Sequence, residues 1–205
     1  MRLLAIETAT EACSVALFED GRLLGAAHET IGRGHAERLV PMIADLEGKG
    51  RADEIRVSLG PGSFTGIRIG LATARALGVA WGAPVRGYPT LALVASMARG
   101  QGAQDVTVCM TGGHGEWFVQ DFGDDGLPAE ELLSLTPSAA AAHGAGPIVA
   151  GSKAEELVDL LDDRPAIFAD ELPNASQCLS LPEQLLTDIL TPHYGRPPDA
   201  KRPAK

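Results

Sequence analysis

The stretch LGPGSFTGIRIGLATARALG, residues 59–78, combines a glycine-rich turn with a helix that carries an unusual stripe of small residues. The stripe recurs at every fourth position, on one face of a helix expected over residues 63–80: Gly66, Gly70, Ala74 and Gly78. Glycine inside a helix costs about 1 kcal/mol relative to alanine, so several on one face need a structural reason. Another backbone must pack closely against this face. It belongs either to the chain's own sheet or to a partner's helix, and the sequence leaves both open.

The turn GPGSFTG has some features of a phosphate-binding loop. It follows an expected strand, EIRVSLG, and opens a helix that Ser63 or Thr65 could cap. However, it has no lysine, and its spacing matches neither GxxxxGK[ST] nor GxGxxG. The turn alone is therefore only weak evidence for a phosphate site.

Alternating and periodic apolar patterns place further elements along the chain. RLLAIETAT predicts a strand, and CSVALFEDGRLLGAAHE predicts a hairpin that turns at Asp20-Gly21. HAERLVPMIADLE predicts a helix with one apolar face: Leu39, Met42, Ile43 and Leu46. Later, QDVTVCM and GEWFVQDF predict strands, while SKAEELVDLL and PEQLLTDIL predict helices. The mixture predicts an α/β protein made of two successive units.

Charge is distributed unevenly along the chain. Residues 1–104 carry 11 basic and 10 acidic side chains, whereas residues 105–190 carry 2 basic and 16 acidic ones. The last fifteen residues, 191–205, form a Pro-rich tail with 4 basic side chains and 1 acidic one. We therefore expect a first lobe at 1–104, an acidic second lobe at 105–190 and a basic, solvated tail. The acidic lobe should repel polyanions, so it is a poor surface for nucleic acid.

Several features indicate a cytoplasmic protein. The sequence has no apolar run of about 18 residues that could cross a membrane, and its first apolar stretch meets Glu7 and Glu11 too early for a signal peptide. The cysteines, Cys13, Cys109 and Cys178, form no CxxC pair, and we expect reduced thiols in the core. At 45% hydrophobic residues, the chain can bury a proper core.

Four segments together resemble one protein family: LAIETATEACSVAL, HAERLVPMI, GPGSFTGIRIGLATARALG and the closing YGRPPDAK. In this order and spacing they are similar to TsaB, the smaller partner of TsaD in bacterial synthesis of threonylcarbamoyladenosine in tRNA. The resemblance covers nearly all of the first half and the tail, and residues 110–180 match poorly. It implies the actin, sugar-kinase and heat-shock-ATPase fold, with two lobes that each contain a mixed sheet and flanking helices.

The resemblance also implies a role without catalysis of its own. In this family TsaD holds the metal and transfers the threonylcarbamoyl group to the adenosine 3′ of the anticodon. TsaB is required as a scaffold and activator, and the small ATPase TsaE joins the larger complex. The chain would then form a heterodimer with TsaD, or a homodimer when alone, and would meet tRNA only through the complex.

The family's two first-lobe helices form a bundle with those of TsaD or of a second TsaB. On this chain they correspond to residues 35–47 and 63–80. Combined with the small-residue stripe, this predicts a partner interface of His35, Leu39, Met42, Ile43, Gly66, Ile67, Gly70, Leu71, Ala74 and Gly78.

A nucleotide site, if any, is expected to be degenerate and to involve Glu7, Thr8 and Thr10. Glu7 stands where the family pattern has Asp, and its extra methylene would push the carboxylate into the phosphate space. Where the family has Asp-Ala-Arg in the second lobe, this chain has Thr111, Gly112 and Gly113. We therefore expect no cofactor beyond a weak or interfacial nucleotide.

No metal site is expected from spacing. TsaD-type enzymes use an HxxxH pair, and no two of the histidines are four apart: His28, His35, His114, His143 and His193. Two alternatives remain open. One is a small ATP-dependent phosphotransferase of the same fold. The other, weaker one is a peptidase that uses Ser63, although GPGSFTG is not the GxSxG elbow.

Overall fold

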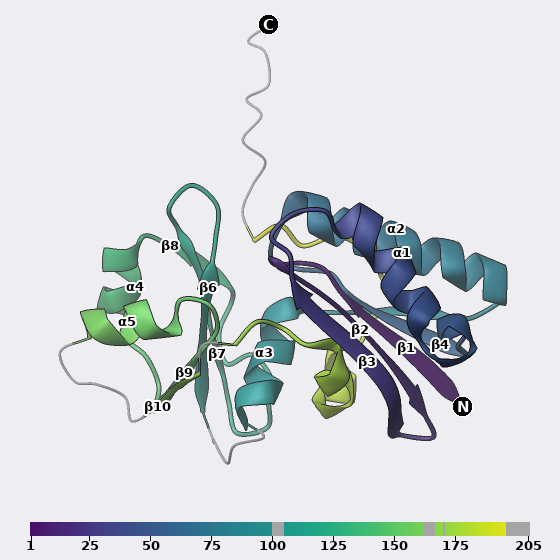
Figure 1. Ribbon diagram of the computed structural model, residues 1–205. Helices are drawn as coiled ribbons and strands as arrows, with labels where there is room; N and C mark the ends of the chain where they lie inside the picture. Colours follow the sequence, from purple (N-terminus) through teal and green to yellow (C-terminus); the bar gives the residue numbers. More distant parts are fainter. Residues whose placement is uncertain (100–104, 162–166, 170, 196–205) are drawn as a thin grey trace, which may run out of the picture.

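The computed structural model describes residues 1–99, 105–161, 167–169 and 171–195 of the chain. Within them the chain forms two five-stranded sheets, one in each lobe (Figure 1). The basic tail predicted for 191–205 lies outside the described residues from 196 onward. No helix in the described part of the chain is long and apolar enough to cross a membrane.

The first sheet has the strand order β3-β2-β1-β4-β5. Its strands are β1 (Arg2–Glu7), β2 (Ala12–Glu19), β3 (Arg22–Thr30), β4 (Glu54–Ser58) and β5 (Val85–Tyr88). The first three pair antiparallel, as expected from the hairpin at Asp20-Gly21, and β4 and β5 then run parallel to β1. This mixed sheet is the scaffold on which the first lobe's helices pack.

Helices cover both faces of the first sheet. Helices α1 (His35–Asp45) and α2 (Phe64–Trp81) lie side by side and pack on one face, where Leu4 and Ile6 of β1 join their core. The opposite face of β1 carries Leu3 and Ala5, which pack in the cluster that contains α3 (Thr90–Arg99). Because side chains alternate along a strand, β1 is buried on both sides.

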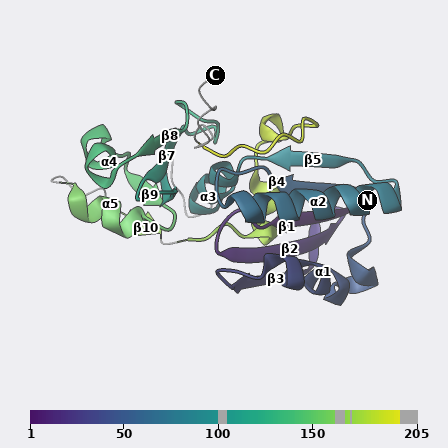
Figure 2. The ribbon, with the colours of Figure 1, turned by 90° about the horizontal axis from the view of Figure 1, so that it is seen from above.

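The second sheet has the order β10-β9-β6-β7-β8. Its strands are β6 (Val106–Thr111), β7 (Trp117–Phe122), β8 (Leu133–Leu135), β9 (Ile148–Ala150) and β10 (Ile167–Ala169). Helices α4 (Pro137–His143) and α5 (Ala154–Leu160) pack on one face of it. Helix α3 lies between the two sheets (Figure 2), and the cluster around it contains residues of both lobes.

The segment after β10 returns to the first lobe. It contains two short 3-10 helices, η2 (Ala175–Ser180) and η3 (Glu183–Leu185). The Ala175 amide donates to Ser14 Oγ in β2 at 3.0 Å, and the His193 amide donates to the carbonyl of Leu59 at 2.7 Å. The part of the predicted acidic lobe after about residue 174 therefore packs with the first lobe.

The helix predicted for PEQLLTDIL, residues 182–190, is wrong. After the short η3 the backbone of Thr187 pairs with Gly87 at the free edge of β5. The Gly87 amide donates to the Thr187 carbonyl with an N···O distance of 2.7 Å, and the Thr187 amide donates to the Gly87 carbonyl at 2.9 Å. An edge strand offers unpaired backbone groups, and the segment satisfies them only in an extended form. Tertiary pairing thus overrides the local helical pattern.

The small-residue stripe of α2 faces the chain's own first sheet. A Cβ on Gly66 would lie 2.0 Å from the carbonyl oxygen of Thr8, and one on Gly78 would lie 2.6 Å from Val85 Cγ2. Both distances are far below van der Waals contact. Of the two readings that the sequence left open, close approach to the chain's own sheet is the one that the structure shows.

Candidate functional site

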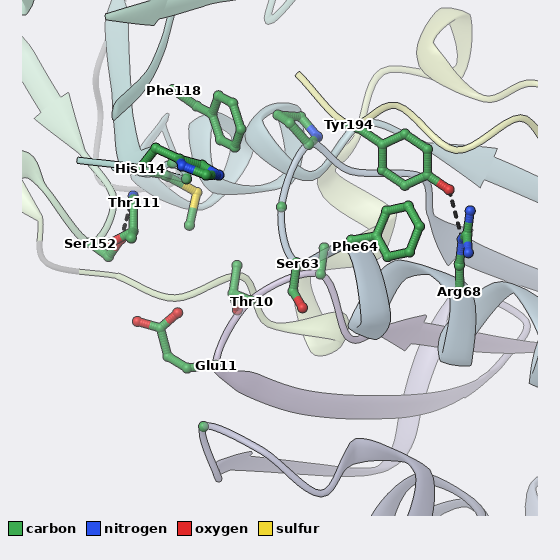
Figure 3. A pocket seen from close by; sticks show the side chains of 17 residues that line it. Thr10, Glu11, Ser63, Phe64, Arg68, Thr111, His114, Phe118, Ser152 and Tyr194 are labelled. Carbon is green, nitrogen blue, oxygen red and sulfur yellow. Dashed lines mark hydrogen bonds between the residues drawn. The ribbon is translucent and has the colours of Figure 1, made fainter. Parts of the chain in front are cut away.

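A cavity of about 770 Å³ lies between the two lobes (Figure 3). The first lobe lines it with residues 9–11 and with the start of α2, and the second lobe lines it with the turn between β6 and β7. Phe118 of β7 and Tyr194 of the returning segment complete the walls. Its volume is typical of small-molecule sites.

Arg68 is engaged at the rim of this cavity. Its guanidinium carbon lies 3.6 Å from the centroid of the Phe64 ring, and its Nε donates to the hydroxyl of Tyr194 at 2.9 Å. The rings of Phe64 and Tyr194 lie 4.9 Å apart (Figure 3). Together these contacts, a cation–π pair and a hydrogen bond, fasten the returning segment to the first turns of α2.

The second-lobe wall of the cavity carries the hydroxyls of Thr111 and Ser152. The Thr111 amide donates to Ser152 Oγ at 3.1 Å, and the two hydroxyl oxygens lie 3.2 Å apart. At Gly112 a Cβ would lie 2.6 Å from the carbonyl oxygen of Glu116, so the turn requires glycine there. A side chain at position 112 would therefore force the backbone of this turn to shift.

Two of the residues predicted to form a degenerate nucleotide site do not reach the cavity. Thr10 lines it, but Glu7 and Thr8 are fully buried. Glu7 Oε1 accepts hydrogen bonds from the Ala9 amide and from Ser58 Oγ, both at 2.7 Å. Instead of entering the phosphate space, the longer side chain holds the turn after β1 against β4.

Burial also changes the acidity of Glu7. Desolvation raises the pKa of its carboxyl from 4.5 to about 7, although the hydrogen bonds from Ala9 and Ser58 favour the charged form. A carboxylate that faces a bound metal–nucleotide would need the opposite, a solvated and charged state. Because Glu7 is fully buried and does not line the cavity, its role is structural.

The cavity does not fit a metal–nucleotide complex. Arg68 is the one guanidinium or ammonium group among the described residues that line it, and it is held by Phe64 and Tyr194. Helix α2 begins at Phe64, and Ser63 Oγ already accepts the Gly66 amide at 3.2 Å as the helix cap. This cap uses one of the N–H groups that an anion would need.

The side chains predicted as the partner interface are buried inside the chain. His35 has the most exposed side chain among them, at only 5%. Its Nε2 donates to the carbonyl of Ala12 at 3.1 Å. The remaining ones are buried as well: Leu39, Met42, Ile43, Gly66, Ile67, Gly70, Leu71, Ala74 and Gly78. The prediction is corrected on this point, because the side chains that fill the sheet face cannot also contact a partner.

The opposite face of α2 is exposed and also small. Ala72, Ala76 and Ala80 recur at every fourth position and point away from the sheet, and Val79 beside them is 87% exposed. On the neighbouring α1, Val40 is 57% exposed. This second stripe was present in the sequence, but the prediction considered only the glycine stripe, which faces the sheet.

Comparisons with known proteins identify the family. The family model for TsaD, tRNA N6-adenosine threonylcarbamoyltransferase, matches residues 24–134, just over half of the 205 residues. The Escherichia coli protein named tRNA threonylcarbamoyladenosine biosynthesis protein TsaB is 40% identical over 131 residues, which cover 61% of this chain and 56% of that one. The matched region thus spans about half the length of this curated relative.

Solved structures agree with the assignment. YeaZ from Pseudomonas aeruginosa superposes with a TM-score of 0.76 and 34% identity, over 88% of this chain and 89% of that one. The ethanolamine utilization protein EutJ from Carboxydothermus hydrogenoformans, 12% identical with a TM-score of 0.52, shares the fold alone. The two mixed sheets with flanking helices are those of the expected actin and sugar-kinase fold. By its motifs, its fold and these matches, the chain belongs to the TsaB proteins of the TsaD family.

Proposed function

We propose that the chain is an accessory subunit in the synthesis of threonylcarbamoyladenosine in tRNA, and that a TsaD-type partner performs the transfer. Membership of the TsaB proteins supports this role, as does the name of the Escherichia coli relative, a tRNA threonylcarbamoyladenosine biosynthesis protein. The second lobe's excess of acidic side chains favours contact with tRNA through the partner.

The observation that carries the proposal is the outward face of α1 and α2. Ala72, Ala76 and Ala80 form a smooth surface on α2, flanked by Val79 and by Val40 of α1. Small side chains allow a second pair of helices to approach closely, and the exposed valines lose water when they do so. A TsaD-type subunit with the same fold presents the corresponding helices, so the two pairs would form a bundle.

The same face would serve a homodimer when the chain is alone. A heterodimer and a homodimer that use one face exclude each other, so addition of the TsaD-type partner should dissociate the homodimer. TsaE would join the larger complex.

An accessory role also agrees with the cavity between the lobes. Glu7 and Thr8 are buried away from it, and Arg68 is engaged with Phe64 and Tyr194. The engaged Arg68 disfavours the alternative phosphotransferase, which would need free cations for the phosphates. Ser63 acts as a helix cap, which disfavours the alternative peptidase.

Depletion in the source cell tests the function. Mass spectrometry of hydrolysed tRNA should show loss of threonylcarbamoyladenosine when the chain is depleted, and recovery when the wild-type chain is supplied again. A second assay with the purified TsaD-type enzyme should form the modified nucleoside only when the chain is added. An unchanged content of modified nucleoside in depleted cells would contradict the proposal.

A further inference from the structure

Three potential metal ligands meet at one end of the second sheet, away from the cavity between the lobes. Asp121 lies in β7, Glu130 follows it in the connection to β8, and His143 is the last residue of α4 (Figure 1). One ligand atom of each lies within 4.8 Å of the others. The three are far apart in sequence, which is why no spacing pattern predicted them.

The Asp121 carboxylate is held in place by neighbouring groups. The Gly146 amide donates to Thr107 Oγ1 at 2.9 Å, and the Thr107 hydroxyl in turn donates to Asp121 Oδ1. This leaves Oδ2 pointing to the ring of His143, 3.2 Å from its Nε2. Hydrogen bonds that orient a ligand in this way are characteristic of metal sites.

The Glu130 backbone is fixed beside the same carboxylate. The Ala129 amide donates to the Asp121 carbonyl at 2.8 Å, and Gln120 Nε2 donates to the Glu130 carbonyl at 3.1 Å. Within the described residues, the Glu130 carboxylate itself makes no hydrogen bond or ion pair. It is exposed, and it can turn toward Asp121 and His143 without breaking a contact.

The charges at this place favour a cation. With a neutral imidazole the three ligands carry two negative charges. A hollow of about 300 Å³ beside Asp121 adds a further carboxylate, Asp105, and its described lining includes no lysine or arginine.

We propose that Asp121, Glu130 and His143 bind a first-row divalent transition ion, with Zn²⁺ as the reference case. One imidazole and two carboxylates are a common ligand set for such ions, at bond lengths of about 2.0–2.2 Å. Small rotations of the exposed Glu130 side chain and of the His143 imidazole bring their ligand atoms to the ion. The ion then ties α4 and the β7–β8 connection to the second sheet, which stabilises the lobe.

Calorimetric titration of the full, tag-free chain with ZnCl2 tests the site. The expected result is one saturable Zn²⁺ site per chain and a Tm that rises with Zn²⁺. Glu130→Gln and His143→Gln should each raise the Kd at least tenfold and abolish the Tm shift. His193→Gln is the matched control, because His193 is also exposed and lies outside the cluster, and it should bind as the wild type does.

Titration with CoCl2 gives an independent readout. Ligand-field absorption of bound Co²⁺ should appear with the wild type and with His193→Gln, and should be lost with His143→Gln. Absence of saturable Zn²⁺ binding by the wild type would overturn the proposal, and so would unchanged binding by both cluster variants. In either case Asp121 and His143 would form only a hydrogen-bonded pair.

Discussion

The Thr8 hydroxyl donates a hydrogen bond to the carbonyl of Gly66 at 2.8 Å, and its oxygen lies 2.3 Å from the position that a Cβ on Gly70 would take. This contact joins the end of β1 to the first turns of α2. The hydroxyl explains the glycine at position 70, although glycine is unfavourable in a helix. At position 66 the reason is the Thr8 carbonyl oxygen, which lies 2.0 Å from the place of a Cβ.

Gly70→Ala should lower the free energy of unfolding by about 1–3 kcal/mol, because the new methyl group displaces the Thr8 hydroxyl and breaks its hydrogen bond. In a Thr8→Ala background, Gly70→Ala should be neutral or should stabilise the protein by up to about 1 kcal/mol, because alanine favours the helix. Without the Thr8 hydroxyl, the remaining neighbours of the new methyl group lie at ordinary contact distances. The nearest of these is Val57 Cγ2 at 3.5 Å. Urea denaturation of the wild type, the two single variants and the double variant measures how far the effect of Gly70→Ala on stability depends on Thr8.

Gly25→Ala in β3 is the control for this series. A Cβ there would meet only Leu46 Cδ2, at an ordinary 3.5 Å, so stability should change by less than about 0.5 kcal/mol. If Gly70→Ala lowered the free energy of unfolding by the same amount with and without Thr8→Ala, the close contact with Thr8 would not be the reason for the glycine at position 70.

Glu7 should make stability depend on pH. Burial raises the pKa of its carboxyl in the folded protein from 4.5 to about 7, so the folded state binds this proton more tightly than the unfolded chain. The stabilisation that results from this tighter proton binding is fully present below pH 4.5 and is lost as pH rises to about 7. The loss amounts to about 3 kcal/mol at most.

Glu7→Gln should remove this dependence, because the amide keeps an acceptor for Ala9 and Ser58 but does not titrate. Urea denaturation at about pH 5 and about pH 8 should show a smaller decrease in stability for the variant than for the wild type. If the stability of the wild type and of Glu7→Gln changed in the same way with pH, Glu7 would have the same pKa in the folded and unfolded states.

Mg²⁺–ATP should bind the isolated chain weakly, with a Kd above about 1 mM. The reason is that Glu7 and Thr8 do not line the cavity and that Arg68 is held at its rim. Titration calorimetry, with Mg²⁺ alone as the control, measures this. A micromolar Kd would instead support the phosphotransferase.

Local patterns in the sequence predicted most elements of the fold. The hairpin at Asp20-Gly21 has the positive φ values, 49° and 80°, that its turn residues favour, and α1, α2 and α5 occur where apolar periodicity placed them. Residues 182–190 were mispredicted because the free edge of β5, distant in sequence, decides their conformation.

The candidate sites were harder to predict, because they depend on which way each helix faces. Both small-residue stripes of α2 have the same period, and only the position of Thr8 and Val85 decides that Gly66 and Gly78 face inward. In the same way, the sequence places Glu7 at the end of a strand but does not show that Ser58 binds its carboxylate. Asp121 and His143 meet only through the packing of α4 on the second sheet.

Affinity for the cognate TsaD-type subunit tests the central claim, that the outward face of α1 and α2 binds this partner. Val79→Arg places a charge on that face, and Leu160→Arg places one on exposed apolar surface of α5 as the matched control. The account predicts a tight heterodimer for the wild type and for Leu160→Arg, and at least a tenfold rise in Kd for Val79→Arg, about 1.4 kcal/mol. Equal affinity of all three proteins, each with native stability, would contradict it.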